Sequence, residues 1–311
     1  SLIMLQHFLY FCKMLYYRRK ILLALLETFG GNLTAKSLQK YLFLFTQTQE
    51  NPAFDFIPYK YGCFSFQANQ DILTMQKYGY IEIIEKENGR LISLQKGKPI
   101  FPLLIDSDQI KLKETKKRFE HFSQTELIIF TYKKYPYYAI NSTIAQDLLT
   151  ETELEIVKQQ KVNKSEQQLF SIGYEGISLE SYINKLIKND IHVLCDVRKN
   201  AFSQKYGFSK NQLQKACEGV GIQYVHIPEL GIESDKRQTL NSQKDYDILF
   251  EQYEQTTLKE KKEYIFKIQH IIEVEKRVAL TCFEKDPAQC HRTRIIKVLM
   301  NLPEIKYSYK T

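Results

Sequence analysis

Two cysteines, a glutamate, a histidine and an arginine lie within eleven residues near the end of the chain. They are Cys282, Glu284, Cys290, His291 and Arg292. Thiols and imidazoles can bind metals or take part in nucleophilic catalysis, carboxylates can transfer protons, and a guanidinium can hold an anion. This run is the strongest candidate for a functional site in the sequence.

A strand is predicted directly before this run and a helix directly after it. Residues 278–280 are apolar, and the apolar residues after the run recur at helical spacing, at Ile295, Ile296, Val298 and Leu299. Asp286 followed by Pro287 predicts the start of the helix, because Asp is a good N-cap and Pro fixes φ at the first helical position. The candidate residues therefore lie between a strand end and a helix start, where open α/β sheets bind ligands.

The second half of the chain alternates between strand and helix signals. Strands are predicted at 169–172, 191–197, 222–227 and 278–282, with helices at 179–187, 210–217, 246–272 and 293–300. Alternation of this kind requires crossovers and favours a mostly parallel sheet covered by helices. The sequence predicts an α/β domain over 169–311.

Every predicted strand of this domain ends in polar or glycine residues, and in a parallel sheet these ends share one edge. Tyr174 follows the first strand, and Asp196 and Arg198 end the second. The loop after the second strand adds further polar candidates, at Ser203, Lys205 and Tyr206. The fold is expected to gather these side chains with the run at 282–292.

Two interpretations of the charged residues remain open. Arg198 and Arg292 suit a clamp for a phosphate or carboxylate, and the substrate would also contact the residues named at the strand ends, namely Tyr174, Ser203, Lys205, Tyr206 and Cys290. Asp196 and Glu284, with His291, would then transfer protons or attack a glycosidic carbon. The alternative is that the carboxylates only form structural ion pairs with the arginines.

The cysteines allow two further readings. Cys290 would be activated as a nucleophile in the first turn of a helix beside His291, or Cys282, Cys290 and His291 would bind zinc. The seven-residue gap between the cysteines fits no common zinc knuckle, and a small buried cysteine is ordinary core. We therefore expect no metal and no cofactor.

The first half of the chain, residues 14–160, reads as mainly helical with one hairpin. Three helical segments precede the hairpin at 80–94, which is the order of a winged helix-turn-helix; a helical interaction module is the alternative. Thr34 is expected to cap the second helix, 54–65 to be turn-rich, and 125–148 to form two more helices. The polar segment 158–168 is the expected domain boundary.

Composition limits the classes of function. The net charge of +8 permits contact with DNA or a nucleotide without requiring it. Six cysteines without disulfide-like spacing favour a reducing cytoplasm. The apolar opening of about a dozen residues is too short to span a bilayer, so no membrane association is expected.

Five motifs of the second half resemble the family of domain of unknown function 488 over residues 169–302. They are Ser-Ile-Gly-Tyr-Glu-Gly at 171–176, Cys-Asp-Val-Arg at 195–198, Phe-Ser-Gln-Lys-Tyr-Gly-Phe-Ser at 202–209, Tyr-Val-His-Ile-Pro-Glu-Leu-Gly at 224–231, and the run at 282–292. The resemblance implies no activity. One departure is Ile232, where the family pattern leads us to expect a second glycine after Gly231.

The first half resembles Panacea-type domains of toxin–antitoxin and phage-related proteins, at 38–44, 56–65 and 73–81. That resemblance implies a regulatory or partner-binding role. Together these features lead us to expect an enzyme acting on a nucleotide or nucleic-acid-linked anion, at a glycosidic bond, in genome maintenance or phage defence. The alternative is a non-catalytic module that binds a nucleotide, another anion or DNA.

Overall fold

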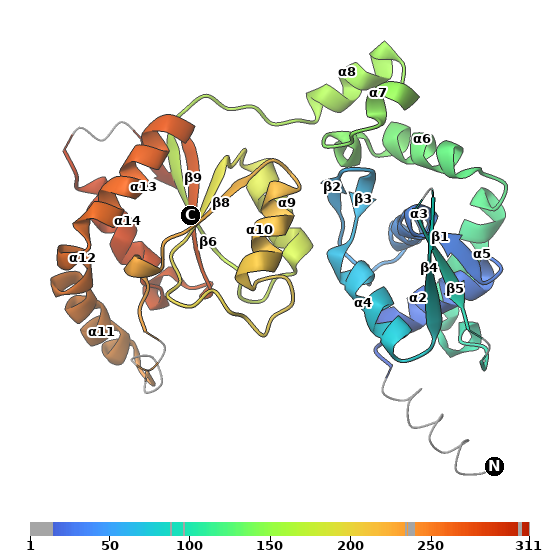
Figure 1. The fold of residues 1–311 in the computed structure, drawn as a ribbon, viewed down its shortest axis with the longest axis horizontal. Helices are drawn as coiled ribbons and strands as arrows, with labels where there is room; N and C mark the ends of the chain where they lie inside the picture. The colour runs from blue at the N-terminus through green and yellow to red at the C-terminus, as the bar shows by residue number, and fades with distance from the viewer. Residues whose placement is uncertain are drawn as a thin grey trace, which may run out of the picture. The chain divides into compact units, whose positions relative to one another are not determined.

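The computed structural model describes residues 15–87, 89–95, 97–233, 235, 240–303 and 307–310. The chain divides into two compact units, residues 1–160 and 161–311 (Figure 1). The apolar opening segment lies outside the described residues. Within the described part, no helix is both long and apolar enough to cross a membrane.

The N-terminal unit begins with helices that precede an antiparallel hairpin. Its first elements are α2 (Tyr17–Thr28), β1 (Asn32–Thr34), α3 (Ala35–Thr46), β2 (Ile57–Tyr59), β3 (Gly62–Phe64), α4 (Phe66–Lys77), β4 (Ile81–Lys86) and β5 (Gly89–Leu94). The strands β1, β5 and β4 form one antiparallel sheet in that order. The predicted hairpin is confirmed, and Thr34 caps α3 by accepting a hydrogen bond from the backbone N–H of Ser37.

One detail of this unit differs from the prediction, because the segment expected to be turn-rich contains the paired strands β2 and β3. The two helices predicted at 125–148 are present, and a short 3-10 helix that starts at Pro136 lies between them. The remaining elements of the unit are η1 (Phe101–Leu103), α5 (Asp106–Phe119), α6 (Gln124–Lys134), η2 (Pro136–Ala139), α7 (Ala145–Leu148) and α8 (Glu151–Gln159).

The C-terminal unit is the α/β domain that the alternating pattern predicted. Its elements are β6 (Gln168–Gly173), α9 (Leu179–Lys188), β7 (Val193–Asp196), α10 (Lys210–Glu218), β8 (Gln223–His226), η3 (Pro228–Leu230), α11 (Gln243–Gln255), α12 (Thr257–Glu260), α13 (Lys262–Glu275), β9 (Arg277–Cys282), η5 (Pro287–Gln289), α14 (Arg292–Met300) and β10 (Ser308–Lys310). The predicted helix at 246–272 is divided into α11, α12 and α13, and β10 was not predicted.

All neighbouring strands of this sheet are parallel, in the order β10-β6-β9-β7-β8. The register aligns Gly173 with Cys282, and Asp196 with both Thr281 and His226. The carboxyl ends of four strands therefore meet at one edge, as the sequence predicted.

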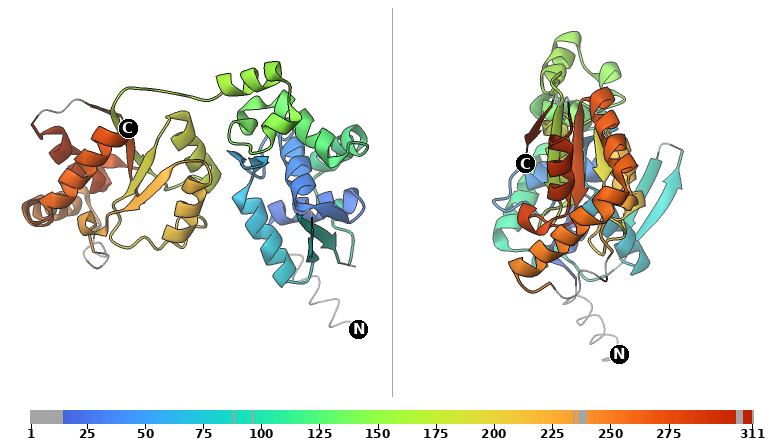
Figure 2. Two further views of the ribbon diagram at one scale, coloured as in Figure 1. Left: turned by 45° about the horizontal axis from the view of Figure 1, so that its top comes forward. Right: turned by 90° about the vertical axis from the view of Figure 1, so that its left-hand side faces the viewer.

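Helices cover both faces of the sheet, with α9 and α10 on one side and α11 to α14 on the other (Figures 1 and 2). Cys195 and Leu280 belong to the hydrophobic core formed with α11, α13 and α14. Because side chains alternate along a strand, Asp196 and Thr281 face α9 and α10. The hydroxyl of Tyr182 in α9 donates to Thr281 Oγ1 at 2.7 Å, which agrees with this assignment.

The prediction that the last helix starts at Pro287 is wrong, because a separate short 3-10 helix precedes it. Asp286 does act as an N-cap, but it caps the three-residue 3-10 helix η5. Cys290 then adopts an extended conformation, with φ −125° and ψ 128°, so the hydrogen-bonded helix starts anew at Arg292. Cys290 thus precedes the helix, and no α-helix N-terminus lies at Pro287.

Candidate functional site

The residues singled out from the sequence form two groups at the carboxyl edge of the sheet. The first, the Asp196 cluster, consists of Asp196, Arg198, Tyr174 and Tyr224. The second, the Cys282 cluster, consists of Cys282, Glu284, Cys290 and His291. Alternation along β7 and β9 places Asp196 and Cys282 on opposite faces of the sheet.

A buried ion pair forms the centre of the Asp196 cluster. The Arg198 Nε lies 2.8 Å from Asp196 Oδ1 and 3.0 Å from Oδ2, and its Nη2 donates to Oδ2. The same carboxylate accepts the Tyr224 hydroxyl at 2.6 Å and the backbone N–H of Arg198 at 3.1 Å. This is the structural ion pair that the sequence left open as the alternative to a catalytic carboxylate.

The remaining donors of Arg198 are also engaged inside the domain. Its Nη1 donates to the Tyr174 hydroxyl at 2.7 Å and to the backbone carbonyl of Phe208 at 2.8 Å. Burial lowers the pKa of the guanidinium, but hydrogen bonding to Asp196 and its charge outweigh burial and raise that pKa overall. Arg198 is therefore a permanently charged internal cross-link between β7, β6 and the loop before α10.

Tyr174 is a core residue in the structure. It is 2% exposed, and its ring lies parallel to that of Phe208 with centroids 4.2 Å apart. This packing leaves the ring unsuited to stacking on a substrate. The loop residue Lys205 covers it, donating from Nζ to the Tyr174 carbonyl at 2.8 Å.

The loop that carries Lys205 is stabilised by local hydrogen bonds. Ser203 Oγ accepts the backbone N–H of Lys205, and Ser203 N–H donates to Ser209 Oγ. Burial lowers the pKa of the Lys205 ammonium. Ser203, Lys205 and Tyr206 are all partly exposed at this edge.

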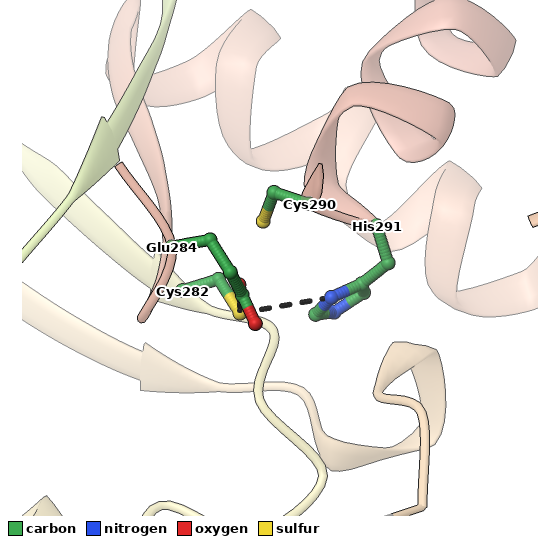
Figure 3. Close-up of side chains that lie close together, drawn as sticks. All are labelled: Cys282, Glu284, Cys290 and His291. Carbon is green, nitrogen blue, oxygen red and sulfur yellow. Dashed lines mark hydrogen bonds between the residues drawn. The ribbon is translucent and has the colours of Figure 1, made fainter. Parts of the chain in front are cut away.

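The Cys282 cluster brings four different side chains together. One ligand atom from each of its residues lies within 4.8 Å of every other (Figure 3). Cys282 Sγ is 3.0 Å from Glu284 Oε2 and 3.6 Å from His291 Nδ1. Cys282, Cys290 and His291 are at most 2% exposed, whereas Glu284 is only half-buried. Glu284 is thus the member of the cluster that solvent and solutes can reach.

The ring of His291 is held in one orientation. Its Nε2 lies 2.9 Å from the backbone carbonyl of Val197, and the ring packs edge-to-face on Tyr253 of α11. Because a carbonyl can only accept a hydrogen bond, Nε2 carries the proton. In the neutral ring the lone pair is then on Nδ1, which faces Cys282.

Arg292 lies beside this cluster and is 2% exposed. Its Nε donates to Ser171 Oγ at 2.6 Å, and its Nη1 donates to the Glu284 carbonyl at 2.8 Å and to Cys290 Sγ at 2.9 Å. Burial raises the pKa of the Cys290 thiol well above its ordinary value, and Cys282 and Glu284 add to this while Arg292 opposes it. A protonated, buried thiol is a poor nucleophile.

Close packing of two strand ends fixes the backbone around Glu284. A Cβ on Gly173 would lie 2.0 Å from the Glu284 carbonyl oxygen, so only glycine allows this approach. Tyr174 N–H and Glu175 N–H both donate to the carbonyl of Phe283, and Glu175 accepts the N–H of Lys285. The end of β6 thereby holds the segment that carries Glu284.

A cavity of about 380 Å³ runs along β6 beside Arg292. Lys185 and Lys285 add two cations to its lining, and its apolar part comes from Phe170, Ile172, Leu186 and Ile191. Sequence reasoning missed both lysines. Lys285 lies inside the run already singled out, but nothing local connects Lys185, in the middle of a helix, to that run.

Residues 178–299 match the family described as Domain of unknown function DUF488. No curated protein matches the chain. The match includes the whole Cys282 cluster, and it begins after Tyr174 and ends close to the end of α14. The α/β unit of this chain is therefore similar to the DUF488 family over residues 178–299, and the resemblance indicated by the sequence motifs is confirmed for this stretch.

Proposed function

We propose that the C-terminal unit is an enzyme that acts on a nucleotide or a nucleic-acid-linked anion, with Glu284 as the group that transfers protons. The observation that carries the proposal is the setting of this carboxylate. Glu284 is half-exposed, while the three side chains that converge with it are buried. A carboxylate at the carboxyl edge of a parallel sheet lies where such folds bind substrates.

The lining of the neighbouring cavity supports an anionic substrate. Lys185, Lys285 and Arg292 offer positive charge, and the apolar residues of the lining suit a flat ring. Arg292 also donates to the carbonyl of Glu284, so a lining residue of the cavity contacts a member of the Cys282 cluster. We propose that the anionic group of the substrate binds in this cavity, next to the arginine that holds the backbone of Glu284.

We propose a wider range of cleaved bonds than the glycosidic bond expected from the sequence. Attack at a glycosidic carbon by paired carboxylates needs two available groups, and Asp196 is occupied by Arg198 and Tyr224. Glu284 remains as an acid–base group. Hydrolysis or transfer at a glycosidic or phosphoester bond both fit one such carboxylate.

The test uses the full chain and the Glu284→Gln variant. Each is incubated with a panel of nucleoside monophosphates and short single-stranded oligonucleotides, and released base and phosphate are measured by mass spectrometry. We expect turnover to fall by about 10²–10⁴-fold in the variant, because general acid–base catalysis contributes factors of that size. Nucleotide affinity should change only a few-fold.

The matched control is Glu233→Gln, since Glu233 is another exposed carboxylate of the domain and pairs with Lys199 on the surface. This variant should keep wild-type turnover. Turnover of an identified substrate that is unchanged in Glu284→Gln would remove the proposed role. Nucleotide binding in the cavity without any turnover would favour the alternative, a non-catalytic nucleotide sensor.

For the N-terminal unit we propose recognition of a protein partner rather than DNA. The elements that would meet DNA in a winged helix, α4 and the β4–β5 hairpin, carry four acidic residues but only three basic ones over 66–94, Lys77 at the end of α4 included. DNA binding needs an excess of positive charge at the phosphates. Leu73 and Tyr78, at 40% and 54% exposed, instead offer apolar surface around the end of α4.

Fluorescence anisotropy with labelled duplex DNA at low salt tests this assignment. We expect no saturable binding by the full chain. Saturable binding that weakens steeply with added salt would overturn it.

The resemblance of this half to phage-related domains supports a role in genome maintenance or phage defence. The five free cysteines of the described residues support a location in a reducing cytoplasm.

A further inference from the structure

We propose that Cys282, Cys290 and His291 bind a zinc ion, with Glu284 beside an open fourth coordination position. The inference starts from the convergence of two thiols and an imidazole (Figure 3). Cys282 ends β9, whereas Cys290 and His291 lie directly before α14. The binding of the ion stands on this geometry alone. Its chemical use rests on the function proposed above.

The spacing of the ligand atoms fits a tetrahedral ion. Zn–S bonds of about 2.3 Å and Zn–N bonds of about 2.0 Å place adjacent ligand atoms roughly 3.5–3.8 Å apart. Cys282 Sγ and His291 Nδ1 are 3.6 Å apart, and all four ligand atoms lie within 4.8 Å of one another. Binding would therefore need only small side-chain adjustments.

Two of these residues make hydrogen bonds of the kind that metal ligands make to groups outside the coordination shell. His291 donates from Nε2 to the Val197 carbonyl, which leaves Nδ1 as the coordinating nitrogen. Arg292 donates to Cys290 Sγ at 2.9 Å, so the second sulfur also has a hydrogen-bond donor outside the proposed coordination shell. Both contacts are made by buried groups that the fold fixes in place.

The choice of ion follows from the ligand set. Two thiolates and one imidazole select zinc over magnesium or calcium, which prefer oxygen ligands. Two thiolate charges also neutralise a dication in a buried position. Three protein ligands with one open position is the arrangement of a catalytic rather than a structural zinc site.

Glu284 has a defined task at such a site. A water in the open position would become acidic enough to lose a proton to Glu284 near neutral pH. The hydroxide would add to the carbon or phosphorus of the scissile bond, and the leaving group would take the proton back from Glu284. One water is consumed, and its two parts end on the two products.

The experiment measures metal content in the full chain. Protein expressed with added zinc and purified without chelators is analysed by inductively coupled plasma mass spectrometry, and we expect one zinc per chain. Replacement by Co²⁺ should produce thiolate-to-cobalt charge-transfer absorption and visible d–d bands. In Cys282→Ser and Cys290→Ser, zinc retained after dialysis against a chelator should fall at least about tenfold, since even outer-contact changes weaken binding by about 10–100-fold.

Cys217→Ser is the matched control, because Cys217 is equally buried in the same domain but lies in α10, outside the cluster. It should keep its zinc. The cobalt spectrum of the unmutated chain decides the proposal even where a serine variant fails to fold. No zinc and no thiolate–cobalt band, or a Cys282–Cys290 disulfide found by mass spectrometry under native conditions, would overturn it.

Glu284→Gln separates this inference from the proposed function. The variant should retain its zinc and lose turnover. Loss of the zinc in this variant would make Glu284 a fourth ligand and overturn the open site. A chain that binds zinc without turning over any nucleotide would leave the metal site standing and remove the proposed function.

Discussion

The two clusters at the carboxyl edge of the sheet both consist of polar side chains, but these side chains interact in different ways. In the Asp196 cluster, a carboxylate and a guanidinium satisfy each other, and two tyrosine hydroxyls complete the network. In the Cys282 cluster, sulfur, nitrogen and oxygen atoms that all donate electron pairs converge on one point. Opposite charges that meet inside a domain hold it together, whereas several ligand atoms that meet favour a cation between them.

The largest effect on folding stability is expected when the ion pair of the Asp196 cluster is broken. Asp196→Asn leaves the Arg198 charge buried without its counterion, which costs about 3–5 kcal/mol of folding free energy. Urea denaturation of the full chain, followed by circular dichroism, measures the loss in the transition of the C-terminal unit.

The exposed pair Lys199–Glu233 provides the control, with side chains 39% and 52% exposed. Glu233→Gln should change the free energy of unfolding by less than about 1 kcal/mol. A loss below about 1 kcal/mol in Asp196→Asn as well would mean that the buried pair is not what holds the strand ends. The contrast between the clusters would then fail.

A smaller effect is expected at the edge of the same network. Tyr224→Phe removes one donor to Asp196, and hydrogen bonds to charged groups are worth about 1.5–3 kcal/mol. Tyr253→Phe removes a buried hydroxyl that donates to the neutral carbonyl of Leu230, for which about 0.5–1.5 kcal/mol is expected. Urea denaturation of both variants should rank them in that order, and the reverse order would argue against a charged Asp196.

The edge of the sheet could be predicted because each strand carries its own signal. Apolar runs that end in polar residues mark β6, β7, β8 and β9, and parallel pairing follows from the helices between them. Hence Asp196, Glu284 and the two arginines could be assigned to one edge from the amino-acid sequence alone. The short strand β10 lacks such a run, which is why the sequence does not reveal it.

Which side chains contact one another at that edge could not be predicted. Whether Arg198 meets a ligand or Asp196 depends on which face of the sheet each side chain occupies, and the face changes with a shift of one residue. The spacing between Cys282 and Cys290 differs from that of compact zinc knuckles, in which one loop supplies both thiols. Here Cys282 lies at a strand end and Cys290 directly follows η5, which folds the intervening residues back. Lys185 reaches the cavity through the packing of α9, which no local pattern reports.

The backbone carbonyl of Val197 connects the two clusters. Val197 lies between Asp196 and Arg198, so the ion pair on one face of the sheet immobilises the backbone group that orients His291 on the other. The imidazole is thereby preorganised during folding, and the entropy of fixing its ring is lost before any ligand arrives. The Asp196 cluster therefore also fixes the orientation of the His291 ring in the Cys282 cluster.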